Sequence, residues 1–460
     1  MTVMTAAEIA RRCGGSVDGD ADARVDAWAF DSRALSEGAC FVALRDSRDG
    51  HDFVHAAFEA GAHIAVVDHV VADRGRTRSG QALVVVDDTL RALQDVARSV
   101  RAERTGVDVV AVAGSTGKTS TKDLLAAALS PLGCHANAES YNNEFGLPLT
   151  LCNAPSSASV VVTEMGERLP GDLALLCDIA RPRVGVITNV GIAHAEFLGG
   201  HDGVADVLSE LLRALPGDGV AVLNADDDWT DELARRTPAD VVTVGERAGA
   251  DYRISAIETD DNLHPSFSLH GQRLTVPLHG AHNVINAAQA ATVAHHVFGL
   301  SLDEIAIELA GASPGRWRME LLETDDGVTV LNDAYNANPT SMEAALVALA
   351  HLPVRGRRIA VLGEMRELGA HHNDAHRAAG ARAAGLGLDL VVGVGEGGGA
   401  IAIAAREAGA HTELVADAPA AAELLDGLLE PGDAVLCKAS RLVGLEVVAG
   451  SLVAHRRATR

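Results

Sequence analysis

Lysine, aromatic residues and long apolar runs are all scarce in this sequence. Of the 38 lysine and arginine residues, only Lys118, Lys122 and Lys438 are lysines, so each of them is a candidate for a specific role. Aromatic residues make up 3% of the chain, and the apolar residues stand in short runs typical of a globular α/β protein. No run reaches the roughly 18 residues of a membrane span, and the N-terminus lacks the apolar stretch of a signal peptide. We therefore expect a cytoplasmic protein without membrane insertion.

Closely spaced cysteines and an excess of positive charge are also absent. The six cysteines form no close pair and no metal-ligand spacing, which excludes a disulfide framework and a zinc site. The formal net charge of −25 would repel polyanions, which excludes a general nucleic-acid or membrane surface. Any anionic ligand must therefore bind at a local basic site.

The length of 460 residues predicts about three domains. Residues 1–105 alternate strand and helix patterns and predict a small N-terminal α/β domain. Residues 106–313 show a strand, a glycine turn and a helix followed by further β-branched runs, which indicates a central domain with a parallel sheet. After a linker near Ser313, residues 314–460 predict a Rossmann-like, doubly wound C-terminal domain. We expect the chain to be a monomer.

A glycine-rich turn joins the first strand of the central domain to a helix. The turn consists of Gly114, Ser115, Thr116, Gly117, Lys118, Thr119 and Ser120. In a phosphate loop, amides and the helix N-terminus face the phosphates, the lysine reaches the terminal phosphates and the threonine hydroxyl ligates Mg²⁺. Val112 stands where the common pattern has its first glycine. The strand, turn and helix together still indicate an ATP-binding P-loop domain.

Two further residues are placed to complete a magnesium site. Glu164 closes the strand-like run VVVTEM, and a carboxylate at the end of a neighbouring strand is the usual second ligand. His194 follows the run VGVITNV, on the face where such sheets bind ligands. Taken alone, Glu164 would also fit a solvated strand end, and His194 would also fit a structural histidine. Together they predict Thr119, Glu164 and His194 as metal ligands, and Lys118, Glu164 and His194 as catalytic residues.

The phosphate loop and four further segments resemble the Mur ligase family of peptidoglycan synthesis. These segments are ITNVGIAH, GAHNVINAAQA, GRWRME and NDAYNANPTSM, and the resemblance covers essentially the whole chain. YNNEFGLPLTL, NDAYNANPTSMEAAL and LGEMRELG are most similar to the branch that adds D-alanyl-D-alanine to a UDP-N-acetylmuramoyl-tripeptide. The resemblance implies an amide ligase that uses ATP and Mg²⁺, forms an acyl phosphate and closes its third domain on the second.

The resemblance also implies roles for individual residues. The expected nucleotide contacts are Asn283, Asn286, Arg318 and Asp333, and the expected contacts to the UDP-muramoyl substrate are Ser32, Arg33, Asn142 and Asn143. The expected dipeptide contacts are Tyr335, Asn336 and Asn338, and Lys438 and Arg441, at the family's KGSR-like position, are further expected substrate-binding residues. Three alternatives stay open. Asn283 would also suit a helix cap, Arg316 could replace Arg318, and Lys438 could be a solvated charge.

One feature of the family is missing. Most members carry a carbamylated lysine that helps to hold a second Mg²⁺, and Leu208 stands at that position here. Asp206 and Glu210 flank it on a predicted helix, so one carboxylate could replace the carbamate; otherwise both are surface acids. Two other functions stay open: another Mur or folylpolyglutamate synthase-type ligase, and a catalytically silent homologue that binds nucleotide.

Overall fold

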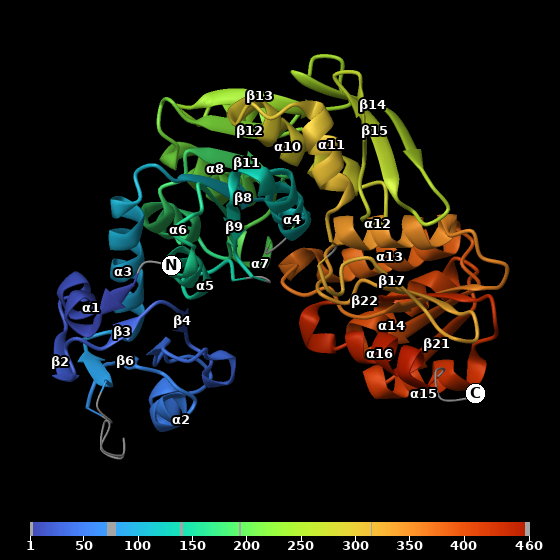
Figure 1. The fold of residues 1–460 in the computed structure, drawn as a ribbon. Coiled ribbons are helices and arrows are strands. Elements are labelled where there is room, and N and C mark those ends of the chain that lie inside the picture. Colours follow the sequence, from blue (N-terminus) through green and yellow to red (C-terminus); the bar gives the residue numbers. More distant parts are fainter. Residues whose placement is uncertain (1–2, 71–79, 139–140, 193–194, 314, 456–460) are drawn as a thin grey trace.

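The chain folds around three large β-sheets, one in each third of the sequence (Figure 1). This computed structural model describes residues 3–70, 80–138, 141–192, 195–313 and 315–455. In the view of Figure 1 the N-terminal part (blue) and the C-terminal part (orange and red) lie on either side below the central part (green and yellow). The α/β class and the three-domain architecture predicted from the sequence are confirmed. Among the described residues, no helix combines the length and apolarity needed to cross a membrane.

The N-terminal sheet has the strand order β2-β7-β6-β5-β4. Its domain comprises β1 (Met4–Thr5), α1 (Ala6–Cys13), β2 (Ser16–Gly19), β3 (Arg24–Val25), β4 (Trp28–Ala29), β5 (Cys40–Val42), α2 (Val54–Glu59), β6 (Ile64–Val67), β7 (Ala82–Val85) and α3 (Thr89–Glu103). Strands β4 to β7 are parallel, and β2 pairs antiparallel with β7. The segments that follow β4, β5 and β6 therefore begin at one edge of the sheet, where ligands of parallel sheets bind.

The central sheet has nine strands in the order β16-β15-β14-β13-β12-β11-β8-β10-β9. Its domain comprises β8 (Asp108–Ala113), α4 (Lys118–Ala128), β9 (Cys134–Ala136), α5 (Gly146–Asn153), β10 (Val160–Glu164), α6 (Asp172–Ala180), β11 (Val184–Ile187), α7 (Ala195–Leu198), α8 (His201–Ala214), β12 (Val220–Asn224), α9 (Thr230–Ala234), β13 (Asp240–Gly245), β14 (Tyr252–Thr259), β15 (Pro265–Leu269), β16 (Gln272–Thr275), α10 (Asn283–Thr292), a π-helical turn (Val293–Val297) and α11 (Leu302–Ala310). Strand β8 lies between β10 and β11, and all three are parallel. Their carboxyl ends form the switch point at which such sheets bind ligands.

The C-terminal sheet has the strand order β17-β18-β22-β19-β20-β21. Its domain comprises β17 (Glu320–Glu323), β18 (Thr329–Asn332), α12 (Pro339–His351), β19 (Arg358–Leu362), α13 (His372–Gly385), β20 (Leu390–Val394), α14 (Gly395–Glu407), β21 (Thr412–Val415), α15 (Ala418–Leu428), β22 (Ala434–Lys438) and α16 (Glu446–His455). All strands except β17 are parallel. Helix α12 begins at Pro339 because Asn338 caps it and proline suits the first helical position.

One apolar core is shared by the first two domains. It joins α1, α3 and β6 to α5, α6 and α8 without interruption. The two faces of the C-terminal sheet carry separate clusters. Among the described residues, the only one that precedes residue 314 in those two clusters is Leu263, in the turn between β14 and β15. The first two domains therefore share a continuous core, whereas the third has its own.

The buried ring of His376 makes the stability of the C-terminal domain depend on pH. Nε2 accepts a hydrogen bond from the amide of Met365 at 2.9 Å, and Nδ1 lies 2.6 Å from the carbonyl oxygen of His372. Burial lowers the pKa of His376 below its ordinary value of 6.5. The unfolded chain therefore binds the proton more readily, and acid favours unfolding.

We expect the free energy of unfolding to fall as the pH drops below about 6.5, by at most about 1.4 kcal/mol per pH unit from this group. Denaturant unfolding followed by circular dichroism at several pH values measures the slope. His376→Gln keeps one acceptor and one donor but does not titrate, so its slope should be smaller. An equal slope in both proteins would contradict the assignment.

Candidate active site

The phosphate loop connects β8 to α4 in a conformation that requires two of its glycines. Gly114 has φ 136° and Gly117 has φ 86°, a region that side chains rarely adopt. A Cβ on Gly114 would lie 2.1 Å from Oγ1 of Thr188, and one on Gly117 would lie 2.5 Å from Oδ1 of Asn286. Helix α4 begins at Lys118 without a side-chain cap, so its first amides are available to an anion.

The segment after β11 holds this loop in place. Oγ1 of Thr188 and Nδ2 of Asn189 donate to the carbonyl oxygen of Thr116 at 2.6 and 3.0 Å. Oδ1 of Asn189 accepts the amide of Thr116 at 3.1 Å, and Oγ of Ser115 accepts the amide of Gly191 at 2.8 Å. The sequence predicts no role for Asn189, whose one signal is its place in the ITNVGIAH segment.

Lys118 pairs with a buried acid that the sequence patterns do not predict. Its Nζ donates to the carbonyl oxygen of Gly114 and lies 3.3 Å from Oε1 of Glu167. Glu167 is only 2% exposed. Burial raises the pKa of Glu167, and the ammonium group of Lys118 opposes that shift. The only signal for Glu167 in the sequence was its position three residues after Glu164, directly beyond a buried strand.

Glu164 joins the loop to the segment before α5. Its Oε2 accepts the hydroxyl of Thr119 at 2.5 Å, and its Oε1 accepts Nδ2 of Asn142 at 2.7 Å. A hydroxyl and a carboxylate side by side are oxygen donors that fit Mg²⁺. Asn143 instead stabilises the turn that leads into α5, because its Oδ1 accepts the amides of Phe145 and Gly146 at 3.3 and 3.0 Å. His194, the third predicted metal ligand, lies outside the described residues.

Two buried asparagines of α10 face the loop from the other side. Nδ2 of Asn286 donates to Oδ1 of Asn283 at 3.1 Å, so both lie on one helix face as the sequence predicts. Asn286 contacts Gly117 closely. Nδ2 of Asn283 donates to the carbonyl oxygen of His279 at 2.9 Å, so the side chain also anchors the start of α10.

Asp333 and Lys438 form a buried ion pair in the C-terminal domain. Nζ of Lys438 lies 2.6 Å from Oδ2 of Asp333 and donates to the carbonyl oxygen of Asn336 at 2.8 Å. The side chain of Lys438 is 1% exposed. The alternative of a solvated charge is therefore wrong, because the strand end of β22 buries this lysine against the loop after β18.

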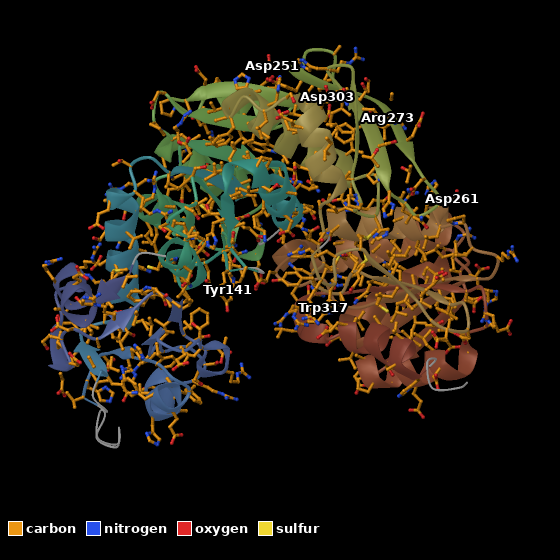
Figure 2. All side chains as sticks on the ribbon, viewed as in Figure 1. Tyr141, Asp251, Asp261, Arg273, Asp303 and Trp317 are labelled. Atoms are coloured by element: carbon orange, nitrogen blue, oxygen red, sulfur yellow. The ribbon has the colours of Figure 1, made fainter. Side chains whose placement is uncertain are left out.

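Three arginines of the C-terminal domain lie on aromatic rings. The guanidinium of Arg318 stands 4.1 Å from the ring centre of Tyr335, and that of Arg441 stands 4.4 Å from Trp317. Arg316 lies 5.5 Å from the same tryptophan ring. Figure 2 shows Trp317 on the side of the C-terminal domain that faces the other two domains. Arg441 also pairs with the carboxylate of Glu446, and the contact with the ring of Tyr335 helps to hold the guanidinium of Arg318 in place.

Asn338 links the C-terminal domain directly to the phosphate loop. Its Nδ2 donates to Oγ1 of Thr116 at 2.9 Å and to the carbonyl oxygen of Ser115 at 3.3 Å. Its Oδ1 accepts the amide of Ser341 at 2.9 Å and so caps α12. One side chain thus performs two separable tasks.

Substitutions at Asn338 should separate these tasks. Asn338→Ala should lower the free energy of unfolding by about 1 kcal/mol through loss of the cap and should also weaken binding of ATP. Asn338→Ser keeps a capping oxygen but cannot reach Thr116 with an amide, so its stability should match the wild type while its ATP affinity falls. Thermal unfolding and calorimetric titration with ATP check both effects. Normal ATP binding by both variants would refute the link.

Ser32 and Arg33 lie apart from this assembly, in the N-terminal domain. Ser32 begins the short helical turn Ser32–Ala34 after β4. The side chain of Arg33 is 89% exposed and pairs with Asp31 at 2.7 Å. They stand at the sheet edge where ligands of parallel strands bind, and no contact joins them to the loop within the described part of the chain.

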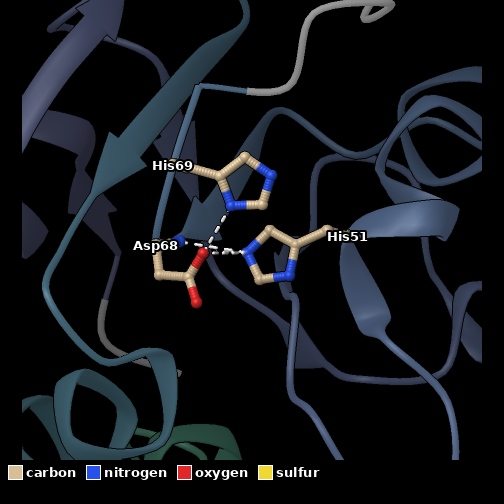
Figure 3. A group of neighbouring side chains, drawn as sticks. All are labelled: His51, Asp68 and His69. Atoms are coloured by element: carbon tan, nitrogen blue, oxygen red, sulfur yellow. Dashed lines mark hydrogen bonds and ion pairs between the residues drawn. The ribbon is translucent and has the colours of Figure 1, made fainter.

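A polar cluster of His51, Asp68 and His69 lies at the same edge (Figure 3). The amide of Asp68 donates to Nε2 of His51 at 3.0 Å, and Nδ1 of His51 lies 2.6 Å from Asp49. Both ring nitrogens of His51 are therefore occupied, which leaves it no lone pair for a metal. The cluster ties the loop before α2 to the end of β6.

The two acids predicted to replace the missing carbamate have other partners. Asp206 pairs with Arg236 at 2.5 Å. Glu210 accepts the amides of Gly171 and Ala174 at 2.8 and 3.0 Å, at the start of α6. The hypothesis that either acid reaches the metal is therefore not supported. Leu208 between them is fully buried, so it packs in the core of the domain.

Known proteins resemble the chain over nearly its whole length. The family description "Mur ligase middle domain" matches residues 112–294, and "Mur ligase, glutamate ligase domain" matches residues 317–441. The UDP-N-acetylmuramoyl-tripeptide--D-alanyl-D-alanine ligase of Mycobacterium tuberculosis is 38% identical over 99% of this chain and 98% of the relative. The protein of that name from Bacillus subtilis is 37% identical over 77% of this chain and 76% of its own.

Solved structures share the three-domain architecture. MurF from Acinetobacter baumannii has a TM-score of 0.85 at 29% identity and covers 99% of both chains. MurF from Thermotoga maritima in complex with ADP has a TM-score of 0.77 at 28% identity and covers 94% of this chain and 98% of its own. The likeness thus extends across all three domains. The chain belongs to the Mur ligase family, in the branch of the UDP-N-acetylmuramoyl-tripeptide--D-alanyl-D-alanine ligases.

Proposed function

We propose that the chain uses ATP to join D-alanyl-D-alanine to a UDP-N-acetylmuramoyl-tripeptide in cytoplasmic peptidoglycan precursor synthesis. The proposal is supported by relatives that carry the name of this reaction. The observation that carries it is the convergence of Lys118, Thr119 and Glu164 at the carboxyl ends of β8 and β10. Asn338 brings the C-terminal domain to the same loop.

The first step activates the tripeptide. Its carboxylate oxygen attacks the γ-phosphorus of ATP, the bond from that phosphorus to ADP breaks, and an acyl phosphate forms. Both reactants are anions, so catalysis consists mainly of positioning and of offsetting negative charge. The loop amides and Lys118 serve the phosphates, while Asn142 orients Glu164. Mg²⁺, with Thr119, Glu164 and His194 as its ligands, would supply further positive charge at the terminal phosphates.

The second step forms the amide. The amine of D-alanyl-D-alanine attacks the acyl carbon, loses a proton, and displaces phosphate. We assign Tyr335, Asn336 and Arg441 to the dipeptide. Asp333 would accept hydrogen bonds from the ribose hydroxyls, with Lys438 positioning it. We assign the remaining nucleotide contacts to Asn283, Asn286 and Arg318. The guanidinium of Arg318 would move from the ring of Tyr335 to the nucleotide.

We place the domain boundaries at 1–105 for the UDP-muramoyl substrate, 106–313 for ATP, and 314–460 for nucleotide closure and the dipeptide. The end of α3 at Glu103 and the start of β8 at Asp108 support the first boundary. We further propose that the protein is a cytoplasmic monomer and that the third domain closes about the linker near residue 313. We assign Ser32 and Arg33 of the N-terminal domain to the uridine diphosphate group of the substrate.

Mass spectrometry of the product tests this function. Purified protein, ATP, Mg²⁺, a UDP-muramoyl-tripeptide and D-alanyl-D-alanine should yield the pentapeptide product with one ADP per amide formed. Glutamate and single amino acids offered in place of the dipeptide should give no product. Product from glutamate would favour a folylpolyglutamate synthase-type ligase, and the absence of phosphate release with every acceptor would favour a silent nucleotide-binding homologue.

A further inference from the structure

The segment LGEMRELG (residues 362–369) begins at the last residue of β19 and has no role in the mechanism above. It lies against the central domain. The carboxylate of Glu367 is 2.7 Å from the guanidinium of Arg168, which follows β10. The carbonyl oxygen of Glu367 accepts the amide of Glu196 at 3.2 Å. Glu196 belongs to α7, which lies on the side of the central domain that faces the C-terminal domain (Figure 1). The segment therefore contacts the connections after β10 and β11 at once.

The backbone of the segment is shaped for this contact. Glu367 has φ 63°, a left-handed conformation that costs free energy in a residue other than glycine. Gly369 has φ 53°, and a Cβ there would lie 2.9 Å from Cα of Glu196, so glycine allows α7 to approach closely. The guanidinium of Arg168 also lies 5.6 Å from the ring centre of Phe197 in α7. A strained residue beside a close backbone approach indicates a contact with a specific task.

On its other side the segment is hydrogen-bonded to the dipeptide residues of the C-terminal domain. The amide of Arg366 donates to Oγ of Ser440 at 2.9 Å, and this hydroxyl donates to the carbonyl oxygen of Ala337 at 3.4 Å. Ser440 directly precedes Arg441, and Ala337 directly follows Asn336. One serine hydroxyl therefore ties both dipeptide loops to the residue next to Glu367.

The central-domain end of this run of contacts lies at the phosphate loop. Arg168 comes four positions after Glu164 in the sequence, and the connection after β11 holds the loop because the amide of Gly191 donates to Oγ of Ser115 at 2.8 Å. In the proposed reaction the acyl phosphate forms at this loop, whereas the C-terminal domain supplies the dipeptide amine. The ion pair of Arg168 and Glu367 therefore stands between the two reacting groups.

We propose that Arg168 is a positioning residue for the second step, because through Glu367 it sets the place of the dipeptide amine relative to the acyl phosphate. This inference rests on the proposed function, which supplies both reacting groups. A misplaced amine reacts slowly, and water then competes for the acyl carbon. The water oxygen attacks that carbon, its protons pass to solvent, phosphate leaves, and the tripeptide carboxylate is regenerated. ATP is then hydrolysed without formation of an amide.

The ratio of ADP released to amide formed tests the proposal. The full-length protein is given ATP, Mg²⁺, the UDP-muramoyl-tripeptide and D-alanyl-D-alanine. The wild type should form ADP and amide in equal amounts. Arg168→Ala should raise the ratio at least about twofold and lower kcat/KM for the dipeptide about fivefold, because it removes the ion pair and the ring contact together. A purely structural defect would lower ADP and amide in the same proportion and leave the ratio unchanged.

Arg377→Ala is the matched control, since this exposed arginine pairs with Glu407 at 2.6 Å within the C-terminal domain, and it should behave as the wild type. Arg168→Lys keeps the positive charge and should restore most of the coupling. Glu367→Gln weakens the same pair from the other domain and should also raise the ratio, which covers the case in which Arg168→Ala fails to fold. Equal amounts of ADP and amide in every folded variant of the pair would overturn this inference alone. A wild type that forms no amide would overturn the proposed function as well.

Discussion

Replacing Lys118 with alanine is expected to lower the rate of product formation by about a thousandfold. The ammonium group is the mobile positive charge of the loop, and Thr119 and Glu164 cannot supply it because one is neutral and the other negative. The substitution also leaves Glu167 buried without its counter-ion, which should lower the free energy of unfolding by about 2 kcal/mol. Phosphate release and denaturant unfolding measure the two effects.

A double variant separates catalysis from stability in this prediction. Lys118→Ala combined with Glu167→Gln removes the unpaired charge, so its stability should return toward that of the wild type. Its activity should stay low, because the phosphates still lack the ammonium group. A rate loss smaller than about tenfold in Lys118→Ala would contradict the role assigned to this lysine.

Replacing Lys438 with methionine should lower the free energy of unfolding of the C-terminal domain by about 3 kcal/mol. The change keeps most of the side-chain volume but leaves Asp333 almost buried without its cation, and it removes the donor to the carbonyl oxygen of Asn336. Breaking a buried pair on one side is costly because the remaining charge cannot be hydrated. Denaturant unfolding followed by circular dichroism measures the loss.

The control removes both charges of this pair. Asp333→Asn with Lys438→Met should recover most of the lost stability, because no bare charge remains. It should not recover the affinity for ATP if Asp333 holds the ribose, as calorimetry with the nucleotide can establish. Equal stability of Lys438→Met and the wild type would show that the pair contributes nothing to folding.

The local parts of the site could be predicted from the sequence. The strand, loop and helix around Gly117 and Lys118 follow each other directly, so a short pattern fixes both the fold and the chemistry. Glu164 was identified for a similar reason, since a carboxylate at the end of a buried strand lies at the ligand-binding edge. The chain itself keeps the loop residues close together, whereas Glu164 is 45 positions from Thr119 and was placed by the general rule for strand ends alone.

The parts that depend on strand order could not be predicted. Asn189 supports the loop and Glu167 pairs with Lys118 only because β8 lies between β10 and β11. The pair of Asp333 and Lys438 spans 105 positions of sequence. The hypothesis for Asp206 failed because helical spacing shows which residues flank a position but not that Arg236, in the turn after α9, pairs with one of them.

The apolar core that α3 shares with α5 and α6 has a practical consequence for anyone who divides this protein. A fragment of the first 105 residues would uncover one side of that core to water, and we expect it to aggregate rather than dissolve. The last third keeps both layers around its sheet, so it should survive as a separately expressed piece. Chemical denaturation of the intact chain should accordingly proceed in two cooperative stages rather than three.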